Sequence, residues 1–245
     1  MLNIEAPMSR QITRRVAMIV FIIGDIHMSP EKIARIPEIE NADLIVINGD
    51  LTNYGSKEDC KTVLNHIMSI NPQVLAQFGN LDKPEINNYL QDLDINLHGQ
   101  ARMFHNRVCF MGVGGSNLTP FATPSEFTEQ ELESLLTAGY DQAQTFIKLA
   151  EPIEKIKIPL ILISHAPPLN TRVDKLANGS HAGSSAVRNF IEKYQPDLCV
   201  CGHIHEAAGS DHIGETPIFN PGMLSKGGWI KTVIDKSTVS AQLHD

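Results

Sequence analysis

The chain has few cysteines for its length, with four in 245 residues. A disulfide framework is typical of small, cysteine-rich secreted chains, so this scarcity argues against one. Cys199 and Cys201 lie two residues apart in an apolar stretch and are interpreted as small core hydrophobes. We therefore expect a reducing, cytoplasmic location.

Long hydrophobic runs are also lacking, since no run reaches the roughly 18 apolar residues that a membrane span needs. Arg14 and Arg15 precede an apolar run at residues 16–23, an order that resembles a secretory signal. The run is too short, and no small-residue cleavage site follows it. We expect a first core strand there and no membrane partner. Residues 1–12 carry no periodic pattern and are expected to be a loose lead-in, with residues 13–245 forming a single domain.

Positive charge is in deficit, with 20 basic against 28 acidic residues and a net charge of −8. Proteins that bind long nucleic acids usually present a basic face to the phosphate backbone, so no such partner is expected. A nuclease on long DNA or RNA is disfavoured for the same reason. A small phosphorylated substrate stays compatible, because bound cations can dominate the local charge. An apolar fraction of 42% and a charged fraction of 20% are typical of an ordinary globular protein. The sequence leaves the oligomeric state, monomer or homo-oligomer, open.

Internal repeats, low-complexity tracts and a domain linker are absent from the sequence. Strand-like apolar runs instead alternate with helix-like stretches, which indicates an α/β protein. Three helix starts carry capping residues: Ser56 with Asp59, Thr128 with Glu131, and Ser184. The chain divides into halves at about residues 16–115 and 157–240, and both carry ligand-type residues. Two sheets packed face to face, with helices outside, would let the halves meet at one site.

Five times, a short apolar run leads to a glycine or serine that is followed at once by a side chain of a type that binds metals. The runs cover residues 16–23, 44–47, 74–78, 159–163 and 198–201. The side chains that follow them are Asp25, His27, Asp50, Asn80, His165, His203 and His205. A single such turn is ordinary, but five place seven ligand types at the carboxyl ends of buried strands, where open α/β sheets bind ligands.

Carboxylate, imidazole and amide oxygen together suit a borderline divalent metal such as Mn, Fe or Zn. Seven side chains are too many for one tetrahedral ion and fit two ions that share one carboxylate. Asp50, a lone carboxylate in the middle of the set, is the natural bridge. Two ions about 3.5–4 Å apart can clamp a phosphoryl group and lower the pKa of a bound water, so that a metal-bound hydroxide attacks phosphorus.

The five motifs resemble those of the calcineurin-like metallophosphoesterases, in family order over about residues 16–235. They read Gly24-Asp25-Ile26-His27, Gly49-Asp50, Gly79-Asn80-Leu81-Asp82, Ser164-His165-Ala166-Pro167 and Gly202-His203-Ile204-His205. The resemblance implies a four-layer αββα sandwich of two mixed β-sheets flanked by helices. It implies one metal held by Asp25, His27, Asp50 and His205, and a second held by Asp50, Asn80, His165 and His203. Among family members, the chain looks most like small bacterial and archaeal phosphoesterases.

The sequence departs from the family at Leu81, where many members have a histidine that lies beside the scissile phosphate. Leucine can neither stabilise charge nor protonate a leaving oxygen. His181 is the candidate substitute, since it precedes a helix N-terminus at Ser184 that could bind phosphate; a surface-loop histidine is the alternative. Asp82 is a candidate to orient a ligand or to act as an ordinary turn or cap carboxylate. Asn117, in a Gly/Ser/Pro loop, is a candidate to border the substrate or to be a plain loop residue.

The sequence thus predicts a dinuclear metal-dependent phosphoesterase, a hydrolase of a small phosphodiester or nucleotide-like ester. Asp50, Asn80 and His181 are the predicted catalytic residues. The alternative is a non-catalytic metal-binding scaffold for protein contacts on the same fold. Scaffolds tend to lose metal ligands, and the retention of seven here favours the enzyme. The substrate, the preference for diester or monoester and the native metals stay open.

Overall fold

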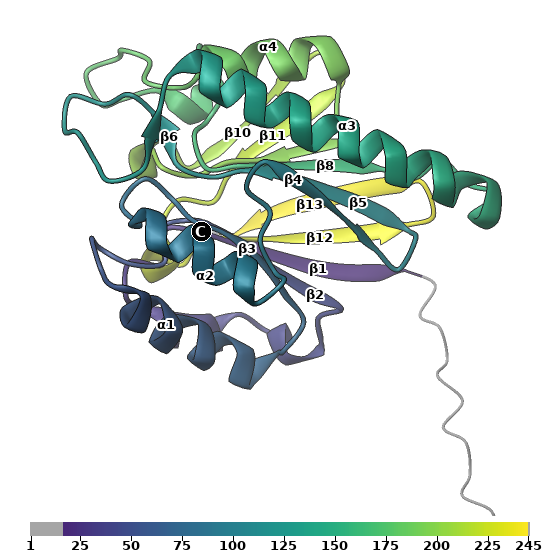
Figure 1. Ribbon diagram of the computed structural model, residues 1–245, viewed down its shortest axis with the longest axis horizontal. Coiled ribbons are helices and arrows are strands. Elements are labelled where there is room, and N and C mark those ends of the chain that lie inside the picture. The colour runs from purple at the N-terminus through teal and green to yellow at the C-terminus, as the bar shows by residue number, and fades with distance from the viewer. Residues whose placement is uncertain (1–16, 245) are drawn as a thin grey trace, which may run out of the picture.

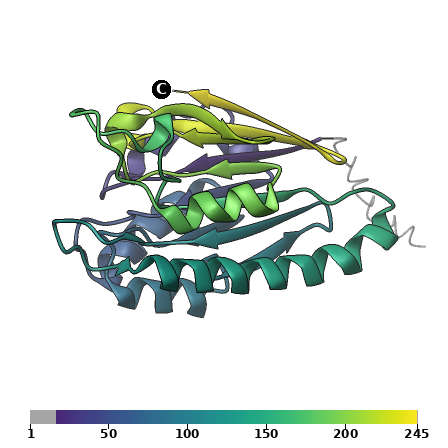
Figure 2. The ribbon, with the colours of Figure 1, turned by 90° about the horizontal axis from the view of Figure 1, so that it is seen from above.

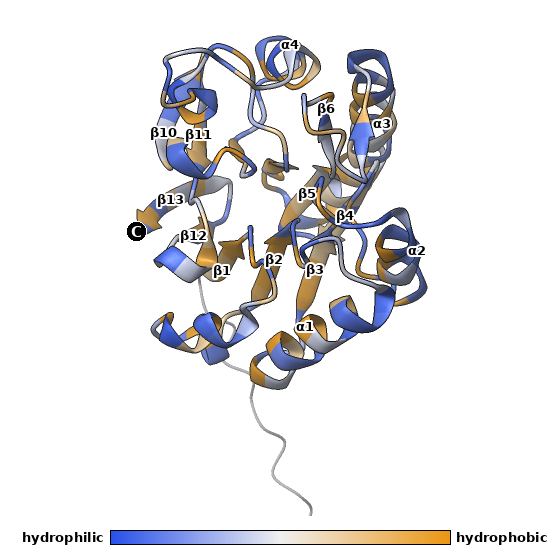
Figure 3. Ribbon diagram, turned by 90° about the vertical axis from the view of Figure 1, so that its left-hand side faces the viewer, coloured by the Kyte–Doolittle hydropathy of each residue, from blue (hydrophilic) through white to orange (hydrophobic). Residues whose placement is uncertain are grey.

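Two β-sheets pack face to face in the computed structural model, and helices cover their outer faces (Figure 1). The structure describes residues 17–244, so the predicted lead-in at residues 1–12 lies outside the described part. The predicted four-layer αββα arrangement is confirmed. The central strands are hydrophobic, whereas the outward faces of the helices are largely hydrophilic (Figure 3). This distribution is expected when each layer buries one face against the next.

The first sheet has the strand order β13-β12-β1-β2-β3. Its strands are β1 (Met18–Ile23), β2 (Leu44–Asn48), β3 (Val74–Gln77), β12 (Trp229–Asp235) and β13 (Thr238–His244). β1, β2 and β3 run parallel, and β12 and β13 are antiparallel additions beside β1. All five residues of β2 are buried, as expected for a strand covered on both faces.

The second sheet has the order β10-β11-β9-β8-β5-β4. Its strands are β4 (Gln100–Phe104), β5 (Val108–Val113), β8 (Leu160–Ser164), β9 (Leu198–Val200), β10 (Gly209–Ile213) and β11 (Thr216–Asn220). β5, β8, β9 and β11 are parallel, and the edge strands β4 and β10 are antiparallel. A short pair, β6 (Ser116–Asn117) and β7 (Glu126–Phe127), stands apart.

The two sheets do not correspond to the two halves of the sequence, which corrects the simple division made above. β4 and β5 come from the first half but join the second sheet, and β12 comes from the second half but pairs with β1. The free edge of β1 explains this exchange, because β12 satisfies it with five antiparallel residue pairs from Met18↔Ile234 to Ile22↔Ile230. The strand exchange joins the halves into one packed body.

Helices α1 (Lys57–Ile70) and α2 (Pro84–Asp92) pack on the first sheet, and α3 (Glu129–Glu154) and α4 (Ser185–Tyr194) on the second. Figure 2 shows α3 running along the sheet with α4 beside it. A third apolar layer lies between the sheets and includes Val20, Val46, Phe110 and Ile161. Short 3₁₀ helices cover Pro30–Arg35, Ile39–Asn41, Arg172–Asp174, His205–Ala207 and Leu224–Lys226.

The predicted helix starts are confirmed at the level of single hydrogen bonds. Ser56 and Asp59 form a reciprocal capping box at α1, and Thr128 and Glu131 form one at α3. The Ser184 hydroxyl accepts the N–H of Val187 at the start of α4. The four cysteines are buried and free, as the sequence indicated. Among the helices described, none has the length and apolar character needed to cross a bilayer.

Candidate metal centre

All seven ligand-type side chains lie at one edge of the molecule, where the parallel strands of both sheets end. Figure 1 shows this edge at the left, and Figure 3 looks onto it. Asp25 and His27 follow β1, Asp50 follows β2, and Asn80 follows β3. His165 follows β8, and His203 and His205 follow β9. The site therefore needs both sheets, which agrees with the placement that the strand-end motifs predict.

Asp25, His27, Asp50 and His205 form a first group whose ligand atoms all lie within 4.8 Å of one another. His205 Nε2 lies 3.1 Å from both Asp25 Oδ1 and His27 Nε2. His27 Nδ1 faces the Asn53 side-chain oxygen at 2.7 Å, and that oxygen can only accept, so Nδ1 carries the hydrogen. The neutral ring then turns its Nε2 lone pair towards His205 and the carboxylates. Lone pairs that converge in this way fit a cation between them.

Asp50, Asn80, His165 and His203 form a second group beside the first. Asn80 Oδ1 lies 3.1 Å from His165 Nε2 and 2.8 Å from His203 Nδ1. His165 Nδ1 donates to the Asn48 carbonyl at 2.8 Å, so the Nε2 that faces the Asn80 oxygen needs either a proton or a cation between the two atoms. Asp50 faces both groups, with Oδ2 3.8 Å from His27 Nε2 and Oδ1 3.6 Å from His165 Nε2.

The backbone at the site adopts conformations that side chains other than glycine usually avoid. Asp25, His27, Asp50 and His203 have φ of 48°, 48°, 47° and 67°. Such left-handed residues cost free energy and persist where the surrounding structure holds them, commonly at functional sites. Gly79 has no room for a side chain, because a Cβ there would collide with the Asp50 carboxylate and backbone nitrogen. These turns let the loops after β2 and β3 approach closely enough to share one site.

Burial and mutual charge set the protonation of the second group. Burial alone would lower the pKa of His165, but Asp50 and then Asp25 outweigh it and raise that pKa to about 9. Burial would raise the pKa of Asp50, yet His165 and His27 hold it below its ordinary value. Burial and the neighbouring His165 lower the pKa of His203 to about 4. His203 is thus a neutral lone-pair donor at pH 7, and a bound cation would replace the proton on His165.

Asp82 joins the loops that carry Asp50 and Asn80. Its carboxylate accepts the N–H groups of Leu51 (3.0 Å), Thr52 (2.8 Å) and Gly79 (2.9 Å) and the Thr52 hydroxyl (2.7 Å). Burial, followed by the charge of Asp50, raises the pKa of Asp82 to about 6. Helix α2 begins without a side-chain cap, so Asp82 does not cap it. This arrangement favours the orienting role over that of an ordinary cap.

Other supporting residues carry no signal in the sequence. The Asn80 amide donates to the Thr123 hydroxyl at 3.0 Å, and this hydroxyl donates to Glu126 at 2.7 Å. The Thr123 bond turns the Asn80 oxygen towards the histidines. Asn53 fixes His27 in the same manner. Thr123 lies 43 residues from Asn80 in a turn-rich segment, so only the folded structure reveals the pair.

His181 lies on the loop before α4, and Asn117, which the sequence placed in a loop, is the last residue of the short strand β6. His181 Nδ1 is 2.6 Å from Asp174 Oδ1, and the Asn117 amide donates to the Ala182 carbonyl at 3.3 Å. The helix N-terminus that motivated His181 is not free to hold phosphate, which corrects that part of the sequence argument. The N–H of Ala186 donates to Glu129 at 2.8 Å, and that of Val187 donates to Ser184. What remains around His181 is its own contact with Asp174.

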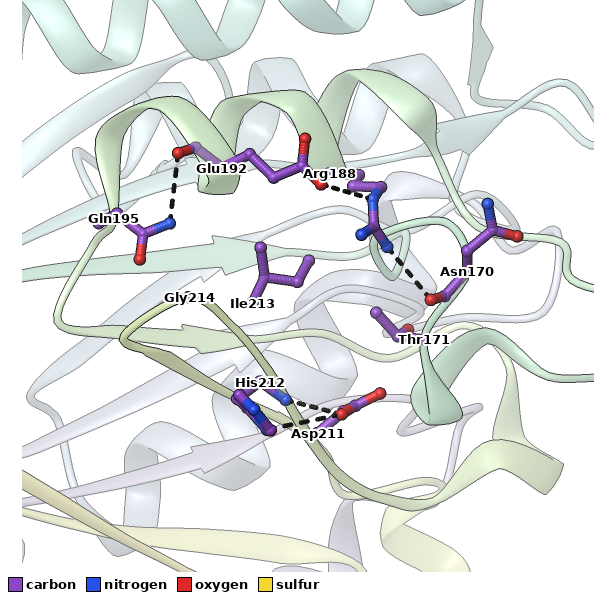
Figure 4. A pocket seen from close by; sticks show the side chains of 9 residues that line it. All are labelled: Asn170, Thr171, Arg188, Glu192, Gln195, Asp211, His212, Ile213 and Gly214. Atoms are coloured by element: carbon purple, nitrogen blue, oxygen red, sulfur yellow. Dashed lines mark hydrogen bonds and ion pairs between the residues drawn. The ribbon is translucent and has the colours of Figure 1, made fainter.

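A pocket of about 500 Å³ opens elsewhere on the surface, between α4 and the turn after β10 (Figure 4). None of the seven ligand-type residues lines it. Its one arginine, Arg188, already donates to the Leu169 and Asn170 carbonyls and to Glu192. Glu192 and Asp211 add negative charge to the wall. The pocket therefore lacks an uncommitted cation for a phosphate group, and the strand-end cluster is the stronger candidate site.

Comparisons with known proteins agree with this geometry. The sequence model of the calcineurin-like phosphoesterases matches residues 18–207. The uncharacterized protein MJ1162 of Methanocaldococcus jannaschii is 35% identical over 184 residues, which cover 74% of this chain and 77% of that protein. The crystal structure of TT1561 of Thermus thermophilus has a TM-score of 0.60 at 15% identity, covering 92% of this chain and 98% of that one. A dimetal phosphatase from Danio rerio has a TM-score of 0.59 at 12% identity, covering 93% and 96%.

Proposed function

The chain belongs to the calcineurin-like phosphoesterase family, and from that premise we propose that it is a dinuclear metal-dependent phosphoesterase. Its proposed substrate is a small phosphodiester or nucleotide-like phosphate ester. The observation that carries the proposal is the position of Asp50, with one carboxylate oxygen towards each histidine group. A shared carboxylate between two nitrogen-rich groups is the arrangement that two adjacent divalent ions require.

In this proposal Asp25, His27, Asp50 and His205 hold one ion, and Asp50, Asn80, His165 and His203 hold the other. Mixed nitrogen and oxygen ligands suit Mn, Fe or Zn. Bound there, such ions would neutralise phosphoryl charge and make water a nucleophile near neutral pH.

The protein's own residues shape the site around this chemistry. Asn48 and Asn53 fix the tautomers of His165 and His27, while Thr123 aims the Asn80 oxygen. Asp82 holds the loops after β2 and β3 at a fixed separation. Asn117, at the end of β6, is hydrogen-bonded to the loop of His181, and we assign both to substrate contacts. The Danio rerio neighbour is described as a dimetal phosphatase, which supports the same interpretation on a shared fold.

The decisive experiment measures metal and turnover on the same preparation. Purified protein is analysed for metals per chain, reconstituted with Mn²⁺, and assayed on bis-p-nitrophenyl phosphate, p-nitrophenyl phosphate and 2′,3′- and 3′,5′-cyclic nucleotides. We expect two metals per chain and diester turnover. Metal-free protein without turnover would favour the non-catalytic scaffold. The cytoplasmic location stays a prediction.

Asp50→Asn tests the bridge directly. The substitution keeps the side-chain size but removes the charge that faces both histidine groups, so at least one ion should be lost. We expect turnover to fall by at least about 10²-fold, since ligand-supporting changes alone cost 10–100-fold. Asp92→Asn, at an exposed aspartate of α2, is the matched control. Full metal content and full activity in Asp50→Asn would contradict the assignment.

A further inference from the structure

A buried carboxylate lies directly beneath His181. Asp174 has no exposed surface, and its Oδ1 lies 2.6 Å from His181 Nδ1. Oδ1 also accepts the N–H of Thr171 at 2.8 Å, and Oδ2 accepts those of Asn170 at 3.1 Å and Gly183 at 3.0 Å. These three backbone donors already fix the Asp174 carboxylate in position. Its contact with His181 is therefore an additional feature of this loop.

The contact determines which nitrogen of His181 is available. A carboxylate can only accept, so Nδ1 must carry a hydrogen and donate it to Asp174. The other nitrogen, Nε2, is then the one that can exchange a proton with a substrate. The His181 side chain is 33% exposed, whereas Asp174 is buried, so the pair has one protected end and one accessible end. A buried aspartate that holds a histidine by Nδ1 is the arrangement that enzymes use to orient a proton donor or acceptor.

The loop that carries this pair is attached to the loops that carry the metal-type ligands. Asn220 donates to the carbonyl of Val173, next to Asp174, and to that of Ile204, between His203 and His205. The N–H of Ala177 donates to Glu206, the neighbour of His205, at 2.6 Å. In Figure 1 this loop, before α4, projects from the same edge as the connection between β6 and β7.

A second attachment runs to the His165 loop. The N–H of Ser184 donates to the Pro167 carbonyl at 2.8 Å, two residues after His165. Gly183 fits against the same carbonyl so closely that a Cβ would lie 2.5 Å from it. The loop is therefore held against both ligand-bearing turns of the second sheet. His181 therefore lies on a loop that is hydrogen-bonded to both of these turns.

We propose that Asp174 positions His181 as the general acid that protonates the leaving oxygen, the task that Leu81 cannot perform. This inference rests on the proposed function. In the step, a water oxygen forms a bond to phosphorus while the bond from phosphorus to the leaving oxygen breaks. The electron pair of the broken bond stays on the leaving oxygen, which takes the proton from His181 Nε2 and departs as an alcohol. The proton of the attacking water passes to solvent, and His181 regains its proton from solvent.

The leaving group makes the test selective. His181→Ala should lower kcat on alkyl phosphate diesters by about 10²-fold, and by much less on p-nitrophenyl diesters, because p-nitrophenolate leaves without help. Asp174→Asn should lower kcat at least about tenfold with the same dependence on the leaving group, while KM and metal content stay unchanged. In the His181→Ala background, Asp174→Asn should cause no further loss. His66→Ala, at an exposed histidine of α1, is the control.

Each failure has a separate signature. If the wild type turns over no ester, the proposed function falls and the acid role falls with it. If the wild type is active but the two variants show equal losses for all leaving groups, or additive losses, then the Asp174–His181 proposal is overturned.

Asparagine at 174 faces backbone donors on both sides and could unfold the loop, so a second measurement uses the wild type. In ¹⁵N NMR spectra of the neutral ring, with His181→Ala identifying the signal, His181 should carry its hydrogen on Nδ1. A hydrogen on Nε2 would contradict the role given to Asp174.

Discussion

At the scale of single residues, Leu81 contributes to the site through its backbone rather than its side chain. Its N–H donates to Asp50 Oδ1 at 2.9 Å, and its carbonyl accepts the N–H of Tyr54 at 3.1 Å. Any residue in this backbone conformation makes the same two bonds. The side chain can therefore vary without disturbing Asp50, which makes position 81 suited to substitution.

Leu81→His should raise kcat/KM for unactivated monoesters by up to about 10²-fold, because it adds a proton donor beside the leaving oxygen. The gain for p-nitrophenyl diesters should be much smaller, since their leaving group is stable as an anion. Steady-state kinetics on both substrates give the ratio. Leu81→Asn, polar but unable to supply a proton at neutral pH, is the matched control. Equal gains on both substrates would contradict the leaving-group argument.

The identities of the ligand-type residues could be predicted from the sequence, but their supports could not. Asp25 and His203 can be recognised in the sequence because each follows a buried strand and a glycine. Thr123 and Asn53 lie in irregular loops, where no period or spacing marks them. Their role exists only once distant loops meet.

At the scale of secondary-structure elements, local chemistry decides what the sequence can show. The sequence predicts α1, α3 and α4 because each begins at a Ser or Thr whose side chain accepts a backbone N–H. It does not predict α2, which has no side-chain cap, or β13, whose alternating residues are exposed or half-buried at a sheet edge. Pairing with β12 defines β13, and pairing is a property of the fold rather than of the segment.

The segment between β3 and β4 holds a histidine that should make stability depend on pH. His98 Nδ1 accepts the N–H of Gly114 at 3.0 Å, and its ring packs 4.6 Å from that of Phe78 and 5.4 Å from that of Phe127. Burial lowers its pKa to about 4. The unfolded chain binds the proton near the ordinary pKa of about 6.5. The stability that neutral His98 contributes is therefore complete above that pH and is lost as the pH falls towards 4.

His98→Asn keeps an acceptor for Gly114 but cannot titrate. From pH 7 to pH 4 the free energy of unfolding should fall less in this variant than in the wild type. The difference between the two falls should be up to about 3 kcal/mol. Urea denaturation at several pH values gives the slope of the unfolding free energy against pH for each protein. A loss of ring packing that is the same at every pH does not change this slope. His105→Asn, at an exposed histidine, should leave the slope as in the wild type. An unchanged slope in His98→Asn would show that the ring is protonated in the fold.

At the scale of the whole molecule, the two sheets are joined by a largely apolar layer, with a group of buried polar side chains near the site. Gln77, fully buried at the end of β3, donates to the Asn48 side chain at 2.8 Å and to the Val113 and Ile163 carbonyls of the second sheet. This hydrogen-bond network fixes one sheet against the other beside the metal-type ligands. The sequence predicts two facing sheets, but the exchange of β5 and β12 between them depends on long-range pairing that no local pattern encodes.

Because the proposed ligands come from both sheets, bound metal should stabilise the whole fold rather than one loop. Asp25, Asp50 and Asn80 belong to the first sheet, and His165 and His203 to the second, so an unfolded chain has no equivalent site. An ion at 100 times its Kd adds about 2.7 kcal/mol. For a chain of this size, that should raise Tm by roughly 5–10 °C.

Thermal melts of Mn²⁺-loaded and EDTA-treated protein give this shift. Asp92→Asn should retain the shift, and Asp50→Asn should lose most of it; a full shift in Asp50→Asn would place the stabilising ion elsewhere.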